Sequence, residues 1–178
     1  MSDNRRTLKR YELPNHVRYL TCSCYGRLPL FKSDRVKDAF VDRLSFVRRQ
    51  TDFALYAWVV MPEHFHLLLT PDLPDFTVTA ILHALKRPFS KDVLARWREL
   101  NAPILSRITD AQGRPHFWLG GGGYDRNITS REELYEKLNY IHNNPVRRGL
   151  VESVADWRWS SAAWYERHEG LEMDILPV

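Results

Sequence analysis

The 178-residue sequence has only two cysteines, no apolar run of membrane-spanning length and no internal repeat. Cys22 and Cys24 are too few for a structural zinc site, and their spacing along one strand is too strained for a ready disulfide. We therefore expect both to be reduced core residues. A membrane-spanning helix needs about 20 apolar residues. Residues 1–6 do not resemble a signal peptide, so the sequence predicts a cytoplasmic protein.

The composition is that of a folded chain. Hydrophobic residues make up 44% of the sequence and aromatic residues 12%, which excludes a disordered protein. The length suits one domain over residues 1–178. Within it we expect a core of about 14–150, a basic N-terminal arm of 1–13 and a Trp-rich C-terminal extension of 151–178.

The hydrophobic spacing predicts an order of strand, helix, strand, strand and helix. Strands are expected over 17–25, 53–60 and 64–70, the last two joined as a hairpin by Met61-Pro62-Glu63. Helices are expected over 33–50, over 76–100 with a break at Pro88, and over 130–144. Residues 101–129 look irregular, with one short strand near 116–119. This order predicts an α+β fold, a ferredoxin-like sandwich with a central antiparallel sheet and helices packed on it.

Two histidines lie in what otherwise reads as a buried strand. His64 and His66 flank Phe65, so their side chains emerge on one face, roughly 6.5–7 Å apart along the strand. Phe65 and Leu67 would then point into the core. Two neutral imidazoles so placed can converge on one divalent metal. An isolated pair of this kind is also common as a structural feature, so its meaning depends on a partner elsewhere.

A predicted helix carrying Tyr140 and Asn144 supplies such a partner. Ser130, three residues before Glu133, forms a capping box at its start, and Pro145 predicts its end at or near Asn144. At about 100° per residue, Tyr140 and Asn144 share one flank. The phenol is a potential nucleophile, and the amide oxygen suits Mg²⁺ or Mn²⁺. A surface tyrosine followed by an Asn-Pro stop signal is the alternative interpretation.

Basic residues gather around these segments, although the net charge of +4 is modest. Each cluster alone could be a solvated surface, but together they favour contacts with phosphate groups, and such binding weakens steeply with salt. The clusters are Arg5, Arg6, Lys9 and Arg10; Lys86, Arg87, Lys91, Arg96 and Arg98; and Arg147 and Arg148. Lys137 lies on the flank of Tyr140, where it could stabilise a phenolate or a phosphate. The favoured interpretation is an exposed ion pair with Glu133.

Together these segments resemble the REP-associated tyrosine transposases, the single-tyrosine, insertion-sequence-200-like branch of the HUH endonucleases. The resemblance spans roughly 14–165. It rests on the His64-Phe65-His66 motif and on the segments 57–66, 117–118, 124–128, 140–150 and 156–161. One departure is Leu119, where the family is expected to carry a polar residue, usually Gln.

The resemblance implies that Tyr140 is the nucleophile on a C-terminal helix, and that His64, His66 and Asn144 bind Mg²⁺ or Mn²⁺. It further implies cleavage of single-stranded DNA beside REP-type palindromic hairpins through a 5′-phosphotyrosine intermediate, with later strand joining. A monomer is mildly favoured, although dimeric relatives place the tyrosine helix in trans. Two alternatives remain: a domesticated hairpin-binding protein without cleavage, and a metal hydrolase that uses an activated water.

The four glycines at 120–123 do not fit a nucleotide-binding loop, because the Gly-Lys-Ser/Thr ending of such a loop is missing. They could let the backbone approach DNA closely or act as a hinge for the nucleophile helix. A flexible loop tip is the other interpretation.

Overall fold

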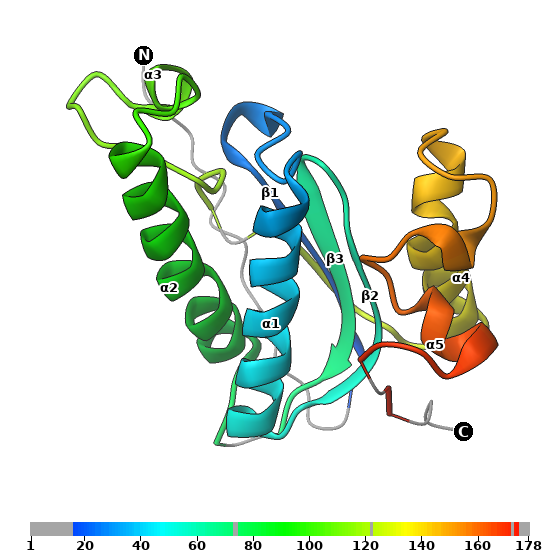
Figure 1. Ribbon diagram of the computed structural model, residues 1–178. Coiled ribbons are helices and arrows are strands. Elements are labelled where there is room, and N and C mark those ends of the chain that lie inside the picture. Colours follow the sequence, from blue (N-terminus) through cyan, green and yellow to red (C-terminus); the bar gives the residue numbers. More distant parts are fainter. Residues whose placement is uncertain (1–15, 73–74, 122, 172, 175–178) are drawn as a thin grey trace, which may run out of the picture.

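In the computed structural model, which describes residues 16–72, 75–121, 123–171 and 173–174, an antiparallel sheet lies between two layers of helices (Figure 1). Its four strands lie in the order β2-β3-β1-β4. They are β1 (Arg18–Ser23), β2 (Ala54–Val60), β3 (His64–Thr70) and β4 (Tyr124–Asn127). Neighbouring strands pair antiparallel throughout, and β2 and β3 form the expected hairpin. The strand order is that of a ferredoxin-like sheet, which confirms the predicted α+β fold.

The helices cover both faces of this sheet (Figure 1). One face carries α1 (Asp34–Thr51) and α2 (Val78–Glu99), and the other carries α4 (Arg131–Arg147) with the short α5 (Ala162–Arg167). The remaining turns are η1 (Tyr25–Arg27), α3 (Leu105–Ile108) and η2 (Val154–Asp156). Within the described part of the chain, no helix is long and apolar enough to cross a membrane.

The sheet separates two hydrophobic cores, and β3 contributes alternate residues to each. Phe65 and Leu67 are 0% and 1% exposed in the core beneath α1 and α2, as expected. Leu68 lies in the second core, which includes the buried face of α4. Because side chains alternate along a strand, His64 and His66 share the face of Leu68. The histidines therefore point to the α4 side of the sheet.

Both prolines that were expected to interrupt helices lie inside them. α2 continues through Pro88, and α4 continues three residues past Asn144 through Pro145, so the predicted break and the predicted helix end are wrong. A proline removes one helical hydrogen bond and crowds the preceding turn. Packing on either side outweighs this local cost: Leu85 and Phe89 are buried in one core, and Pro145 is itself buried.

The fourth strand is displaced from its predicted place near 116–119. It lies at β4, whereas Trp118 forms only an isolated bridge with Cys24. β4 has the polar sequence Tyr-Asp-Arg-Asn, which carries no hydrophobic signal. Gly123 leads into it with φ of +79°, so close to β1 that a Cβ here would clash with the carbonyl oxygen of Thr21. Glycine is therefore required at this approach.

Both cysteines are reduced thiols buried in the core under α1 and α2, as the sequence predicted. Burial raises the pKa of the Cys24 thiol to about 12. The backbone N–H of Cys24 donates to the carbonyl of Glu63 at 2.8 Å. The cysteine segment thus holds the turn between β2 and β3 in place.

The C-terminal extension covers the outer edge of β2. The N–H of Val60 donates to the carbonyl of Trp159 at 2.8 Å, and the N–H of Ser161 donates to that of Trp58 at 3.0 Å. The indole N–H of Trp157 donates to the Val60 carbonyl at 3.0 Å, and its ring lies in the core on the α4 side. An edge strand left open is a site for unwanted pairing, and this segment closes it.

Candidate active site

The three predicted metal ligands meet where β3 faces α4. The Nε2 atoms of His64 and His66 are 3.0 Å apart, and the amide nitrogen of Asn144 lies 3.1 Å from Nε2 of His66. His66 and Asn144 are only 3% and 6% exposed. The strand and the helix thus bring together side chains that are almost 80 residues apart in sequence, as His66 and Asn144 are.

The outer nitrogens of both imidazoles face oxygen atoms. Nδ1 of His64 lies 3.1 Å from a carboxylate oxygen of Glu63, which can only accept, so the ring proton belongs on Nδ1. Nδ1 of His66 lies 2.9 Å from the Tyr19 hydroxyl and 2.8 Å from that of Thr21. These hydroxyls can also accept from Nδ1–H of His66, and in that tautomer the Nε2 lone pairs of both rings point into the shared space, which is the orientation that metal ligands need.

Burial keeps both imidazoles neutral. Desolvation, together with the neighbouring His64, lowers the pKa of His66 to about 3. Desolvation also lowers the pKa of His64, against the opposing effect of Glu63. A histidine binds a metal through its neutral form, so this environment prepares the pair for ligation at physiological pH.

The donor set fits an octahedral divalent metal. Two lone pairs 3.0 Å apart repel unless a cation lies between them. Ligands at right angles with Mg²⁺ bonds of about 2.0–2.1 Å are about 3.0 Å apart, which matches this spacing. In the described residues no three His, Cys, Asp or Glu side chains gather to hold a metal, and the side chain that lies beside the two histidines is the amide of Asn144. A 180° rotation of the Asn144 amide presents its oxygen.

Tyr140 lies beside this cluster in the same chain. Its ring centroid is 5.5 Å from that of His66 and 6.3 Å from that of Tyr19, both in edge-to-face contact. The side chain is 37% exposed, and the guanidinium of Arg147 lies 5.3 Å from its ring centroid. The phenol is therefore open to an incoming ligand while its ring is held by aromatic neighbours.

One flank of the C-terminal half of α4 faces the histidine strand. Tyr140, Asn144 and Arg148 follow each other at intervals of four residues and so share a face. The guanidinium of Arg148 lies 2.7 Å from the same Glu63 oxygen that contacts His64. Arg148 was expected to contact phosphate. Its side chain is 52% exposed, so the guanidinium remains open to a phosphate while it pairs with Glu63.

The start of α4 is fixed by the predicted cap. The Ser130 hydroxyl accepts from the N–H of Glu133 at 3.1 Å, while the Glu133 carboxylate accepts from the N–H of Thr129. Glu133 also pairs with Arg126 at 2.6 Å, not with Lys137.

Lys137 pairs instead with Glu136, at 2.7 Å, so the expected ion pair with Glu133 is wrong. The reason is that the Glu133 carboxylate pairs with Arg126 of β4. The Lys137 ammonium also lies 5.9 Å from the Tyr19 ring centroid, which brings it near the site without contact to Tyr140.

The other predicted basic residues separate into groups. Arg5, Arg6, Lys9 and Arg10 lie outside the described residues. Lys86 and Arg87 line hollows beside the glycine loop, whereas Lys91 is exposed on α2 and lines neither. Among the described residues, the sequence did not identify the histidine partners Tyr19, Thr21 and Glu63. It also did not identify Arg27, which lines one of these hollows.

These hollows form one groove, which we call the glycine-loop groove. One part, of about 370 Å³, is lined by Thr21, Cys22, Ser23, Arg27, Lys86, Leu119, Gly120, Gly121, Gly123 and Tyr124. The other, of about 510 Å³, adds Thr79, Leu82, His83, Arg87, Ser90 and Trp118. None of these described lining residues carries a carboxylate. Tyr124 is 50% exposed, and its ring centroid is 6.0 Å from that of Tyr19, which links the groove to the site.

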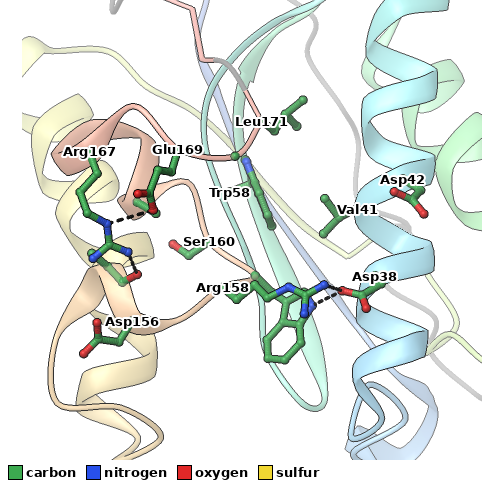
Figure 2. A pocket seen from close by; sticks show the side chains of 14 residues that line it. Asp38, Val41, Asp42, Trp58, Asp156, Arg158, Ser160, Arg167, Glu169 and Leu171 are labelled. Carbon is green, nitrogen blue, oxygen red and sulfur yellow. Dashed lines mark hydrogen bonds and ion pairs between the residues drawn. The ribbon is translucent and has the colours of Figure 1, made fainter.

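A larger cavity, of about 710 Å³, lies between α1 and the C-terminal segment (Figure 2). Its electrostatic character is opposite to that of the glycine-loop groove. The Asp38 carboxylate accepts from Arg158 and from the indole of Trp159, both at 2.9 Å, and Arg167 pairs with Glu169 at 3.1 Å. Since its arginines are paired with carboxylates in this way, the cavity is unsuited to a polyanion.

The remaining histidines and aromatic residues have structural contacts. Nε2 of His142 lies 2.8 Å from the Ser161 hydroxyl, away from the ligand cluster, in line with its predicted direction. His116 pairs with Asp110 at 2.8 Å. Phe117 is 1% exposed, so it is a core residue as expected.

Comparison with known proteins places this geometry in a family. Residues 15–144 match the family described as "Transposase IS200 like". The REP-associated tyrosine transposase of Escherichia coli (strain K12) is 31% identical over 137 residues, which are 74% of this chain and 65% of that protein. A putative REP-associated tyrosine transposase of Haemophilus influenzae is 27% identical over 151 residues, covering 81% and 80% of the two chains.

The fold has a solved counterpart. It is described as the structure of the REP-associated tyrosine transposase bound to a REP hairpin, with a TM-score of 0.65 and 23% identity over 94% of this chain and 87% of the other. This likeness supports the fold, and the family match extends from β1 to Asn144. The chain spans about two thirds of the Escherichia coli protein, at 65% of its length. The chain therefore belongs to the IS200-like transposase family, with REP-associated tyrosine transposases among its relatives.

Proposed function

We propose that this protein is a metal-dependent single-strand DNA transesterase that cuts beside palindromic REP-type hairpins and can rejoin the strands. The observation that carries the proposal is the position of Tyr140, partly exposed and in contact with His66 of the ligand cluster. The family relation and a relative's described complex with a REP hairpin support the choice of substrate.

His64, His66 and the Asn144 oxygen would hold Mg²⁺ or Mn²⁺, which when bound polarises a phosphate and offsets charge in the transition state. The three ligands carry no negative charge, so they leave the cation's charge undiminished. The oxygen of Tyr140 attacks phosphorus, its proton passes to solvent, and the bond from phosphorus to the 3′-oxygen breaks. The products are a 5′-phosphotyrosyl enzyme and a protonated 3′-hydroxyl, and the reverse attack joins strands.

Neighbouring side chains would support this attack. The Arg147 cation, 5.3 Å from the Tyr140 ring, favours negative charge that develops on the phenol oxygen. Tyr19 and His66 pack against the ring edge-to-face and limit its orientations. A positioned nucleophile loses less entropy on reaching the reactive geometry.

The glycine-loop groove gives the single strand a path to the site. Arg27, Lys86 and Arg87 supply its cations, and its described lining has no opposing carboxylate. The half-exposed ring of Tyr124 offers a base-stacking surface, worth about 1–3 kcal/mol per base. Since Tyr140 and the ligands come from one chain, a monomer would be sufficient for cleavage.

The test is formation of a covalent adduct. We would incubate the protein with Mn²⁺ or Mg²⁺ and labelled single-stranded hairpin oligonucleotides, and then separate the products on denaturing gels. Wild type should yield a protein–DNA adduct, and Tyr140→Phe should abolish it while hairpin affinity stays nearly unchanged. Tyr135→Phe is the matched control, because Tyr135 lies on the same helix and is 41% exposed, against 37% for Tyr140.

Two other outcomes would contradict the proposal, and each would indicate a different function. Metal-dependent cutting that survives Tyr140→Phe and leaves no adduct means hydrolysis by water. Tight hairpin binding without cutting in either metal means a domesticated DNA-binding protein.

A further inference from the structure

Glu63 occupies a position that the proposed reaction does not use. Its carboxylate oxygen Oε1 lies 3.1 Å from Nδ1 of His64 and 2.7 Å from the guanidinium of Arg148. The Glu63 side chain is 17% exposed and that of His64 is 13% exposed. One acidic oxygen therefore connects the first histidine of the strand to the end of α4.

The backbone around Glu63 is held on three sides. Met61 N–H donates to the His64 carbonyl at 2.8 Å, which closes the turn between β2 and β3. The carbonyls of Pro62 and Glu63 accept from Phe31 and Cys24 at 2.9 and 2.8 Å. A side chain on so constrained a turn can fix the orientation of its neighbour with little loss of entropy.

Arg148 is equally well placed. Its N–H donates to the Asn144 carbonyl at 3.1 Å, so it extends the face of α4 that carries Tyr140 and Asn144. Its bond to Glu63 ties this face to the histidine turn. A shift of the helix end would therefore alter the Asn144 amide and the Glu63 carboxylate together.

From these contacts we propose that Glu63 is a positioning residue for the metal site, anchored by Arg148. The carboxylate accepts a hydrogen bond from Nδ1–H of His64 and so keeps Nε2 free to bind the metal. The Arg148 cation holds the carboxylate in that position and couples the α4 end to it. This inference rests on the proposed function for its purpose, but the arrangement itself can be tested without DNA.

The first measurement is the tautomer of His64. In ¹⁵N-labelled protein without metal, at a pH where His64 is neutral, long-range ¹H–¹⁵N spectra distinguish protonation at Nδ1 from protonation at Nε2. Wild type should carry the proton on Nδ1. Glu63→Ala should shift the population toward Nε2–H, while Glu63→Gln, whose amide oxygen can still accept, should keep the wild-type tautomer. If Glu63 had a purely structural role, replacing it would leave the His64 tautomer unchanged.

The second measurement is Mn²⁺ affinity, followed by the electron paramagnetic resonance signal of free Mn²⁺. Loss of an outer-sphere partner typically weakens metal binding by about 10–100-fold, and we expect at least tenfold for Glu63→Ala. Arg148→Met should weaken binding at least about twofold. Removal of its charge alone would tighten cation binding, so this sign identifies the anchoring role.

Arg96→Met is the matched control. Arg96 forms an ion pair of similar length with Glu99, at 2.9 Å, but on the exposed surface of α2. The Arg96→Met variant should bind Mn²⁺ with the same affinity as wild type. Circular dichroism checks that each variant is folded, and Glu63→Leu, which also lacks an acceptor, serves if Glu63→Ala is not.

The outcomes separate the two proposals. An unchanged His64 tautomer in Glu63→Ala together with Mn²⁺ affinity within twofold of wild type overturns the role of Glu63. Equal or tighter Mn²⁺ binding in Arg148→Met overturns the anchoring role. If wild type binds Mn²⁺ and shows the predicted tautomer but forms no adduct with DNA, the positioning role stands and the transesterase function does not.

Discussion

Replacing Asp125 by Asn should strongly destabilise the protein, because it breaks a buried ion pair between β1 and β4. The side chains of Arg18 and Asp125 are 3% and 0% exposed. Nε and Nη2 of Arg18 lie 3.0 and 2.6 Å from the same Asp125 oxygen. Asparagine keeps the shape of the side chain but removes the negative charge that lies against the buried Arg18 guanidinium. Removing one partner of such a pair costs about 3–5 kcal/mol.

That cost is large against a typical total stability of about 5–15 kcal/mol. For a domain of this size, about 1 kcal/mol shifts the melting temperature by about 2–4 °C. The loss therefore corresponds to a decrease of about 6–20 °C. Urea unfolding followed by tryptophan fluorescence measures the free energy directly, and an unchanged slope against urea shows that the folded state is intact.

Two companion variants make the result interpretable. Arg18→Met combined with Asp125→Asn should recover part of the loss, because it removes the buried charges of both partners. Arg96→Met, which breaks an exposed pair, should have a much smaller effect. A loss below about 1 kcal/mol in Asp125→Asn would refute the reasoning, since the pair would then behave as a screened surface contact.

Three further predictions concern the groove and the core around β1. Lys86→Ala should reduce the slope of log affinity against log salt by about one, measured with a hairpin that carries single-stranded flanks; an unchanged slope would remove this lysine from the DNA path. Gly123→Ala should lower stability by more than Gly121→Ala, because both have positive φ but only Gly123 packs against the Thr21 carbonyl; equal melting temperatures would contradict this packing. Alkylation of Cys24 at pH 8 should be on the order of 10³ times slower in the native protein than in urea, because its pKa of about 12 suppresses the thiolate; rapid native labelling, read by mass spectrometry, would argue against burial.

Much of the fold could be predicted because strong hydrophobic patterns identify the elements. The apolar runs of β2 and β3 and the stripe of α4 stand out in the sequence. By contrast, β4 is polar and short, so no local signal locates it, and its pairing with β1 depends on tertiary contacts. The helix interruptions predicted at the prolines were wrong for a related reason, since burial of the surrounding residues outweighs the local cost of a proline inside a helix.

The same distinction holds for the candidate site. His64, His66, Tyr140 and Asn144 could be proposed because spacing of two in a strand and four in a helix fixes which side chains share a face. The outer partners of the histidines could not. Thr21 lies opposite His66 only because β1 inserts beside β3 in the sheet, a pairing between segments 45 residues apart.

The closure of β2 by the Trp157–Ser161 segment has a consequence for where the molecule can be shortened. A protein ending near residue 150 would retain all of α4, with Tyr140 and its neighbours, yet it would lose the backbone bonds that now occupy Trp58 and Val60. The bare strand would then offer its N–H and C=O groups to any other extended chain, and self-association through this edge would follow. The segment thus protects the edge of β2, and the smallest unit that keeps this edge covered extends well beyond α4.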